Sequence, residues 1–106
     1  MIKMNAEKFQ EYITQCNKAI LVEFYAPWCG YCRRLAPIME KIAEQYADPL
    51  VIGQVNIDQE PALADQEQIE IVPTLILYQN GRALGSIVAP ESKGAVEAFL
   101  QETAGL

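Results

Sequence analysis

The sequence contains no histidine and only three cysteines, so it has few of the residues that stabilise small proteins through metal sites or disulfide bonds. A closed zinc site usually needs four Cys or His ligands, and a disulfide scaffold usually has a larger and even set of cysteines. The longest apolar runs are only strand-sized, which is too short to span a bilayer. Internal repeats, low-complexity tracts and linkers are also missing. The 106 residues therefore predict a single domain, residues 1–106, with one hydrophobic core.

Basic residues are in the minority, and the formal net charge is −6. Such a charge repels nucleic acid phosphates and anionic lipid surfaces, so we expect neither as a partner. The first residues pass into a polar helical pattern without the apolar segment of a secretory signal, and we therefore expect a cytoplasmic protein. The fractions of hydrophobic and charged residues, 51% and 21%, are typical of a globular chain, and we expect a monomer.

Hydrophobic periodicity predicts four helices and four strands along the chain. Asn5 and Ser92 are good N-caps, Pro61 suits a first helical turn, and Asn80-Gly81 is a strong hairpin turn. Strands joined through helices come first and a hairpin comes last. This order predicts an α/β fold with a central mixed sheet of four to five strands and helices on both faces. The expected strands are 19–25, 50–57, 74–79 and 83–88, and the expected helices are 5–16, about 29–46 with Pro37 inside, 61–68, and the segment after 92.

Two of the three cysteines, Cys29 and Cys32, lie where the first long strand is expected to give way to a helix. The unpaired N–H groups and the dipole at a helix N-terminus favour a thiolate, so Cys29 is the expected nucleophile. Cys32 lies one turn further on, within disulfide reach, and is the expected resolving thiol. Cys16, by contrast, is expected to be a small hydrophobe on the core-facing side of the first helix.

Two other interpretations of the cysteine pair are a structural staple and a metal site. A disulfide that closes so short a loop removes little chain entropy, so a purely stabilising role is weak. A closed metal site lacks ligands, because the chain has no histidine and only Cys16 besides the pair. The placement at a strand-to-helix junction favours redox chemistry over both.

The segment Val22 to Cys32, Val-Glu-Phe-Tyr-Ala-Pro-Trp-Cys-Gly-Tyr-Cys, resembles the thioredoxin superfamily and, in detail, the catalytic domains of protein disulfide isomerases. The resemblance continues through Ala36-Pro37, 55–58, Val-Pro-Thr at 72–74 and Asn80-Gly81, so it covers the whole domain. It implies the thioredoxin fold, a redox pair at Cys29 and Cys32, and no directly bound cofactor. The electrons would come from a flavoprotein reductase that uses NADPH.

Glu23 stands inside an apolar strand, where a charged and unpaired carboxylate is costly. We therefore expect burial to raise its pKa. The family carries an acidic residue at this position, and its role there implies that Glu23 is the general base for Cys32, through water. The alternative is that Glu23 lies on an exposed strand face.

The resemblance also implies a substrate groove beside the redox pair. Pro73 matches the family's cis-proline, whose role is to expose the backbone of Val72 to an extended substrate segment, although a trans proline in an ordinary turn is the alternative. Trp28 and Tyr31 would rim the sulfur with apolar surface, or else be partly buried packing residues. The expected substrate-binding residues are Trp28, Gly30, Tyr31, Val72, Pro73 and Ala89.

The sequence departs from the family at three places. Tyr31 replaces the proline of thioredoxins and the histidine of isomerases, which removes a cation and argues against a strongly oxidising protein. Gln54 replaces the lysine near the buried acid, and we expect the pKa of Glu23 to be higher still. Ala89-Pro90 replaces Gly-Ala and adds a methyl group that narrows the groove.

The function predicted from the sequence is thiol–disulfide exchange that reduces disulfides of protein substrates. The expected partners are those substrates and a flavoprotein similar to thioredoxin reductase. A protein disulfide oxidase or isomerase is the first alternative. A non-catalytic domain that only holds a partner in the Val72-Pro73 groove is the second.

Overall fold

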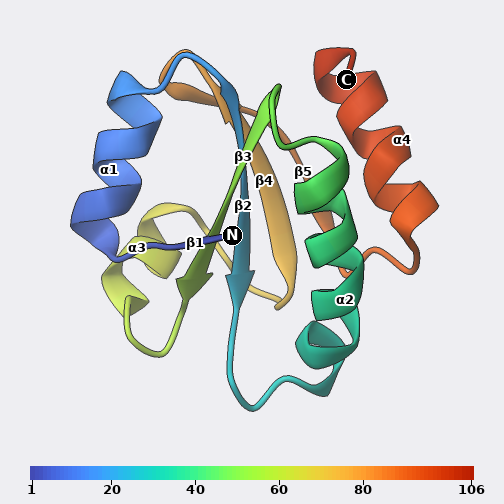
Figure 1. Cartoon of the computed structure of the whole chain (residues 1–106). Coiled ribbons are helices and arrows are strands. Elements are labelled where there is room, and N and C mark those ends of the chain that lie inside the picture. Colours follow the sequence, from blue (N-terminus) through green and yellow to red (C-terminus); the bar gives the residue numbers. More distant parts are fainter.

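A five-stranded mixed sheet forms the centre of the molecule in the computed structural model, which describes all 106 residues (Figure 1). The strand order across the sheet is β1-β3-β2-β4-β5. β1 and β2 run parallel to β3, whereas β4 runs antiparallel to both β2 and β5. The strands are β1 (Ile2–Lys3), β2 (Ala19–Tyr25), β3 (Leu50–Asn56), β4 (Thr74–Gln79) and β5 (Arg82–Val88), and the helices are α1 (Ala6–Gln15), α2 (Gly30–Gln45), α3 (Pro61–Gln66) and α4 (Lys93–Ala104).

Helices cover both faces of this sheet, with α1 and α3 on one side and α2 and α4 on the other (Figure 1). β2 lies in the middle and is buried on both faces, which explains its nearly continuous apolar sequence. Leu21 belongs to the cluster beneath α2 and α4, and Ile20 belongs to the cluster beneath α1 and α3. Because side chains alternate along a strand, Glu23 lies on the same face as Leu21, the face that α2 covers.

The predicted helix starts are confirmed. The Asn5 side chain accepts a hydrogen bond of 2.8 Å from the Lys8 N–H, and the Ser92 hydroxyl accepts one of 3.1 Å from the Ala95 N–H. Pro61 occupies the first turn of α3, where its missing N–H costs nothing. Asn80 and Gly81 both have positive φ, 55° and 84°, as a tight hairpin requires.

The structure differs from the sequence prediction mainly at the sheet edge and at element ends. β1 was not predicted, because two residues carry no periodicity of their own and their strand identity comes from pairing with Gly53 and Gln54. Several ends shift by one or two residues. α1 ends at Gln15 instead of 16, α2 ends at Gln45 instead of 46, α3 ends at Gln66 instead of 68, β3 ends at Asn56 instead of 57, and β5 begins at Arg82 instead of 83. Cys16 caps α1 and is only half-buried.

Candidate functional site

The two neighbouring cysteines are placed by the junction between β2 and α2. Cys29 is the N-cap of α2, and its Sγ accepts a hydrogen bond of 3.1 Å from the Cys32 N–H. Cys32 lies in the first turn, the two Cα atoms are 5.3 Å apart, and the two sulfurs are joined in a disulfide. The N-terminal placement and the pairing of the two cysteines were predicted and are confirmed. When the disulfide is reduced, the same N–H group and the helix dipole stabilise an anion on Cys29.

The segment before β4 packs directly against Cys29. The Val72–Pro73 peptide bond is cis, as the resemblance implied, and the Val72 carbonyl oxygen lies 3.8 Å from the Cys29 Sγ. The N–H group of Val72 donates to no acceptor in the chain, and the side chain of the preceding Ile71 is 57% exposed. The backbone beside the disulfide therefore has a free donor at the surface.

Tyr31 connects the start of α2 to the segment that follows β5. Its hydroxyl donates to the carbonyl oxygens of Ala89 and Pro90, at 3.0 and 3.2 Å. Ala89 has a positive φ of 46°, and its N–H donates to the Pro73 carbonyl at 2.8 Å. Tyr31 is thus half-buried and anchored by its hydroxyl, whereas Trp28 is 67% exposed.

Glu23 is the one carboxyl side chain that the fold buries, with 2% of its surface exposed, so the alternative of an exposed strand face is wrong. Glu23 and Gln54 are register partners in β2 and β3, and the Gln54 amide donates a hydrogen bond of 3.2 Å to Glu23 Oε1. Burial raises the pKa of the Glu23 carboxyl, and this hydrogen bond offsets part of the rise.

A small cavity of about 160 Å³ is lined by both Glu23 and Cys32. Ala36 and Gln54 also line it, and its volume exceeds the roughly 30 Å³ share of one water molecule in the liquid. The Glu23 carboxyl and the Cys32 side chain therefore face one space that has room for water.

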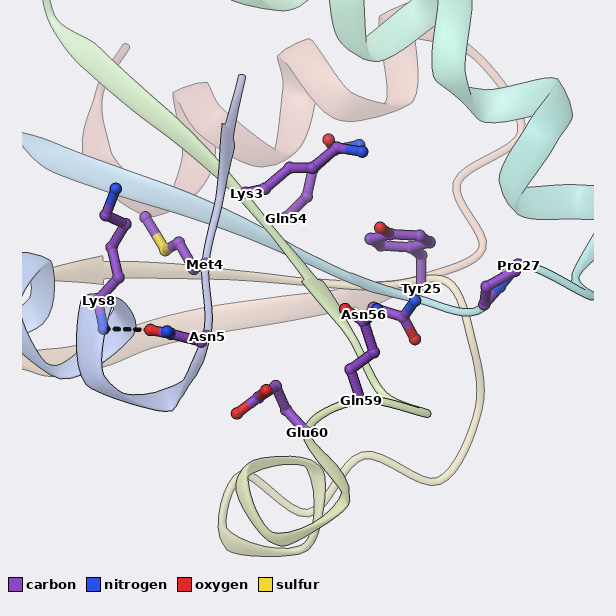
Figure 2. A pocket seen from close by; sticks show the side chains of 10 residues that line it. All are labelled: Lys3, Met4, Asn5, Lys8, Tyr25, Pro27, Gln54, Asn56, Gln59 and Glu60. Atoms are coloured by element: carbon purple, nitrogen blue, oxygen red, sulfur yellow. Dashed lines mark hydrogen bonds between the residues drawn. The ribbon is translucent and has the colours of Figure 1, made fainter.

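A larger hollow of about 610 Å³ lies on the β1 side, and neither cysteine of the pair lines it (Figure 2). Its lining is mostly polar, and Figure 2 shows Lys3 from β1, Lys8 from α1 and Glu60 from the segment before α3 around it. It shares Tyr25, Pro27 and Gln54 with the small cavity. Of these two spaces, only the small cavity is lined by Cys32.

Two arginines to which the sequence patterns gave no role, Arg33 and Arg34, follow Cys32 directly in α2. Arg33 donates from Nη1 to the Pro27 carbonyl at 2.9 Å, and the Arg34 guanidinium lies 5.1 Å from the centre of the Tyr31 ring. The sequence signal that could have identified them is their position immediately after Cys32.

A disulfide that caps a helix, beside a cis-proline and above a buried carboxyl, defines a thiol–disulfide oxidoreductase. A family model described as Thioredoxin matches residues 1–102. The chain belongs to the thioredoxin family and is a disulfide reductase of that kind. No helix has the length and apolarity that crossing a membrane requires, and no group of three or more His, Cys, Asp or Glu side chains is arranged to hold a metal ion.

The similar proteins are thioredoxins of comparable length. The chain is 40% identical over 92 residues to the thioredoxin of Buchnera aphidicola subsp. Baizongia pistaciae, and the aligned region covers 87% of this chain and 84% of that one. It is 37% identical over 100 residues to the thioredoxin of Acidithiobacillus ferridurans, with 94% and 93% covered. It is 39% identical over 94 residues to the thioredoxin of Alicyclobacillus acidocaldarius, with 89% of each covered.

Proposed function

We propose that Cys29 attacks the disulfide of a protein substrate and that Cys32 resolves the resulting mixed disulfide. In the first step the Cys29 thiolate displaces one substrate sulfur as a thiolate. In the second step the Cys32 thiolate attacks the Cys29 sulfur, releases the other substrate sulfur and forms the Cys29–Cys32 disulfide. Two electrons pass to the substrate, whose two thiolates take up protons. The observation that carries this proposal is Cys29 at the N-cap of α2.

Glu23 takes the proton from Cys32 in the second step, through a water molecule in the small cavity. The support is that Glu23 and Cys32 line the same cavity and that the pKa of Glu23 is raised by burial. A carboxyl group with a raised pKa is a better match for a thiol than an ordinary one, since a general base works best when its pKa lies near the operating pH.

The substrate lies extended across the disulfide and pairs with the backbone of Val72. The free Val72 N–H, next to a cis-proline, supports this mode of binding. The groove is rimmed by Trp28, Gly30, Tyr31, Pro73 and Ala89.

The protein works as a single-domain monomer in the cytoplasm and receives its electrons from a flavoprotein reductase that uses NADPH. A reducing compartment suits this direction, because a reductase must be regenerated in its dithiol form.

Trapping of the mixed disulfide tests the proposal. In Cys32→Ser the first step proceeds and the second cannot, so the variant should accumulate a covalent adduct with a disulfide-bonded protein, and dithiothreitol should release it. Cys16→Ser is the matched control and should turn over normally, because Cys16 lies at the end of α1, away from the disulfide. If Cys32→Ser retains full function without an adduct, the chain is a binding module.

An oxidase or isomerase is the second candidate, and one observation favours it. Arg33 and Arg34 place positive charge at Gly30, the residue after Cys29, and positive charge there stabilises the thiolate and makes the disulfide easier to reduce. Equilibration with glutathione buffers separates the two directions. A potential of about −270 mV, the value typical of thioredoxins, supports the reductase, and one of about −180 mV, typical of protein disulfide isomerase, supports the second candidate.

A further inference from the structure

Two guanidinium groups reach back over Gly30, the first of the two residues between the cysteines. Arg33 and Arg34 are both exposed, and they follow Cys32 in the first turns of α2. A methyl group placed on Gly30 would lie 3.6 Å from Arg33 Nη2 and 3.8 Å from Arg34 Nη1. The two charges therefore stand next to each other at the backbone of Gly30.

Each guanidinium is held there by a different contact. The hydrogen bond to the Pro27 carbonyl uses one of the five N–H donors of Arg33. Arg34 lies against the ring of Tyr31, whose hydroxyl is itself fixed by the carbonyls after β5, and this contact uses none of its N–H donors. Most of the donors of both side chains remain free for a ligand.

Neither guanidinium is paired with a carboxylate, although acidic residues outnumber basic ones by 14 to 8. The chain has one salt bridge, between Lys93 and Glu97, which lies on α4. Glu91 lines the same small hollow as Arg34 and Tyr31 but makes no ion pair with Arg34. An acidic protein thus leaves two guanidinium groups at Gly30 without a carboxylate partner.

From this arrangement we propose that Arg33 and Arg34 form a carboxylate-binding subsite, which selects protein disulfides that carry an acidic residue next to the attacked cysteine. The planar fork of a guanidinium matches the two oxygens of a carboxylate. A substrate segment whose sulfur reaches Cys29 must place a neighbouring residue over Gly30, where both forks lie. The inference rests on the proposed function, because it assumes that a polypeptide disulfide is attacked at Cys29.

The test compares two peptides that are joined by a disulfide and differ only in having Glu or Gln beside the attacked cysteine. We expect the kcat/KM of the wild-type protein to be about three- to tenfold higher for the Glu peptide at low salt, as for one or two exposed ion pairs. The ratio should fall towards 1 in about 0.5 M NaCl, because salt screens exposed charges. In the double variant R33Q/R34Q it should be close to 1 at any salt concentration.

Two control variants separate the guanidinium groups at Gly30 from positive charge in general. Lys41→Gln also removes a positive charge from an exposed residue of α2, but far from its first turn, and should leave the ratio unchanged. R33K/R34K keeps both charges without the forks and should retain part of the preference.

The ratio separates recognition from reactivity. Losing the arginines also destabilises the Cys29 thiolate. This lowers the rate of attack on both peptides by the same factor, so the effect cancels in the ratio. A wild-type ratio of 1, or a ratio that persists in R33Q/R34Q, would overturn the inference and leave the proposed function intact. If neither peptide is reduced, the proposed function itself fails.

Discussion

At the scale of single residues, the buried carboxyl group of Glu23 makes the stability of the protein depend on pH. The folded protein binds the Glu23 proton more tightly than the unfolded chain does, because burial raises the pKa of this carboxyl above its ordinary value of 4.5. The unfolded chain gives up the proton first as the pH rises. The wild-type protein therefore loses stability between pH 4.5 and the raised pKa, and it does not regain this stability at higher pH.

Glu23→Gln should remove this pH dependence. The amide cannot ionise and can still accept the hydrogen bond from Gln54. We expect the variant to have a higher free energy of unfolding than the wild type at about pH 8, and the difference to shrink as the pH falls to about 4. Urea denaturation of the oxidised proteins at several pH values measures this. Glu44→Gln, at an exposed position of α2, is the matched control, and a variant less stable than the wild type at about pH 8 would contradict the prediction.

The same substitution should slow the reaction. Without the carboxylate, Cys32 has no base within its cavity, and we expect kcat at neutral pH to fall on the order of 100-fold. The loss should become smaller as the pH approaches about 8.5, where a free thiol ionises without help. Stopped-flow measurement of mixed-disulfide decay across this pH range checks the prediction. A loss that is the same at every pH would mean that Glu23 supports the structure without moving the proton.

At the scale of secondary structure elements, Tyr31 links the start of α2 to the segment after β5. Tyr31→Phe keeps the ring against Arg34 but leaves the carbonyls of Ala89 and Pro90 without this donor. We expect the variant to be less stable by about 1 kcal/mol, the usual net value of such a hydrogen bond. The urea midpoint should fall with an unchanged slope. Tyr46→Phe is the control, because the Tyr46 hydroxyl makes no hydrogen bond in the chain, and an equal loss in both variants would refute the role of the Tyr31 hydroxyl.

Sequence patterns predicted the long elements because their signals are local. Each cap, turn and periodic run acts within a few residues, as Asn5, Ser92 and Asn80-Gly81 show. β1 could not be predicted, because it depends on pairing with residues 53 and 54 and on the room that Gly53 leaves for the side chain of Met4. Pairing with β3 determines that these two residues form a strand, so their own sequence carries no signal.

In the candidate site, too, local features could be predicted from the sequence and long-range contacts mostly could not. The Cys29–Cys32 pair and the buried Glu23 follow from the sequence, because a strand-to-helix junction and an apolar strand are local features. The hydrogen bond from Gln54 depends on strand register across 31 residues, and the Tyr31 hydroxyl finds its acceptors 58 and 59 residues away. The family resemblance placed Gln54 near Glu23, but the hydrogen bond itself and the acceptors of the Tyr31 hydroxyl were visible only in the fold.

At the scale of the whole molecule, the two faces of the sheet hold separate hydrophobic clusters that share the same strands. In β4, Leu77 belongs to the cluster beneath α2 and α4, and Ile76 belongs to the cluster beneath α1 and α3. β2 alternates in the same way. A strand that leaves one cluster must leave the other, so the two sides should lose their structure together.

This shared sheet predicts one cooperative unfolding transition. Ile13→Val on α1 and Ile42→Val on α2 each remove one methylene group from a buried isoleucine, on opposite faces of the sheet. Each should lower the free energy of unfolding by about 0.5–1.5 kcal/mol and shift the whole transition without changing its slope. Far-ultraviolet circular dichroism and the fluorescence of Trp28, the single tryptophan, should give coincident curves for all three proteins. Curves that separate in only one variant would show that the two faces unfold independently and that the chain is not one domain.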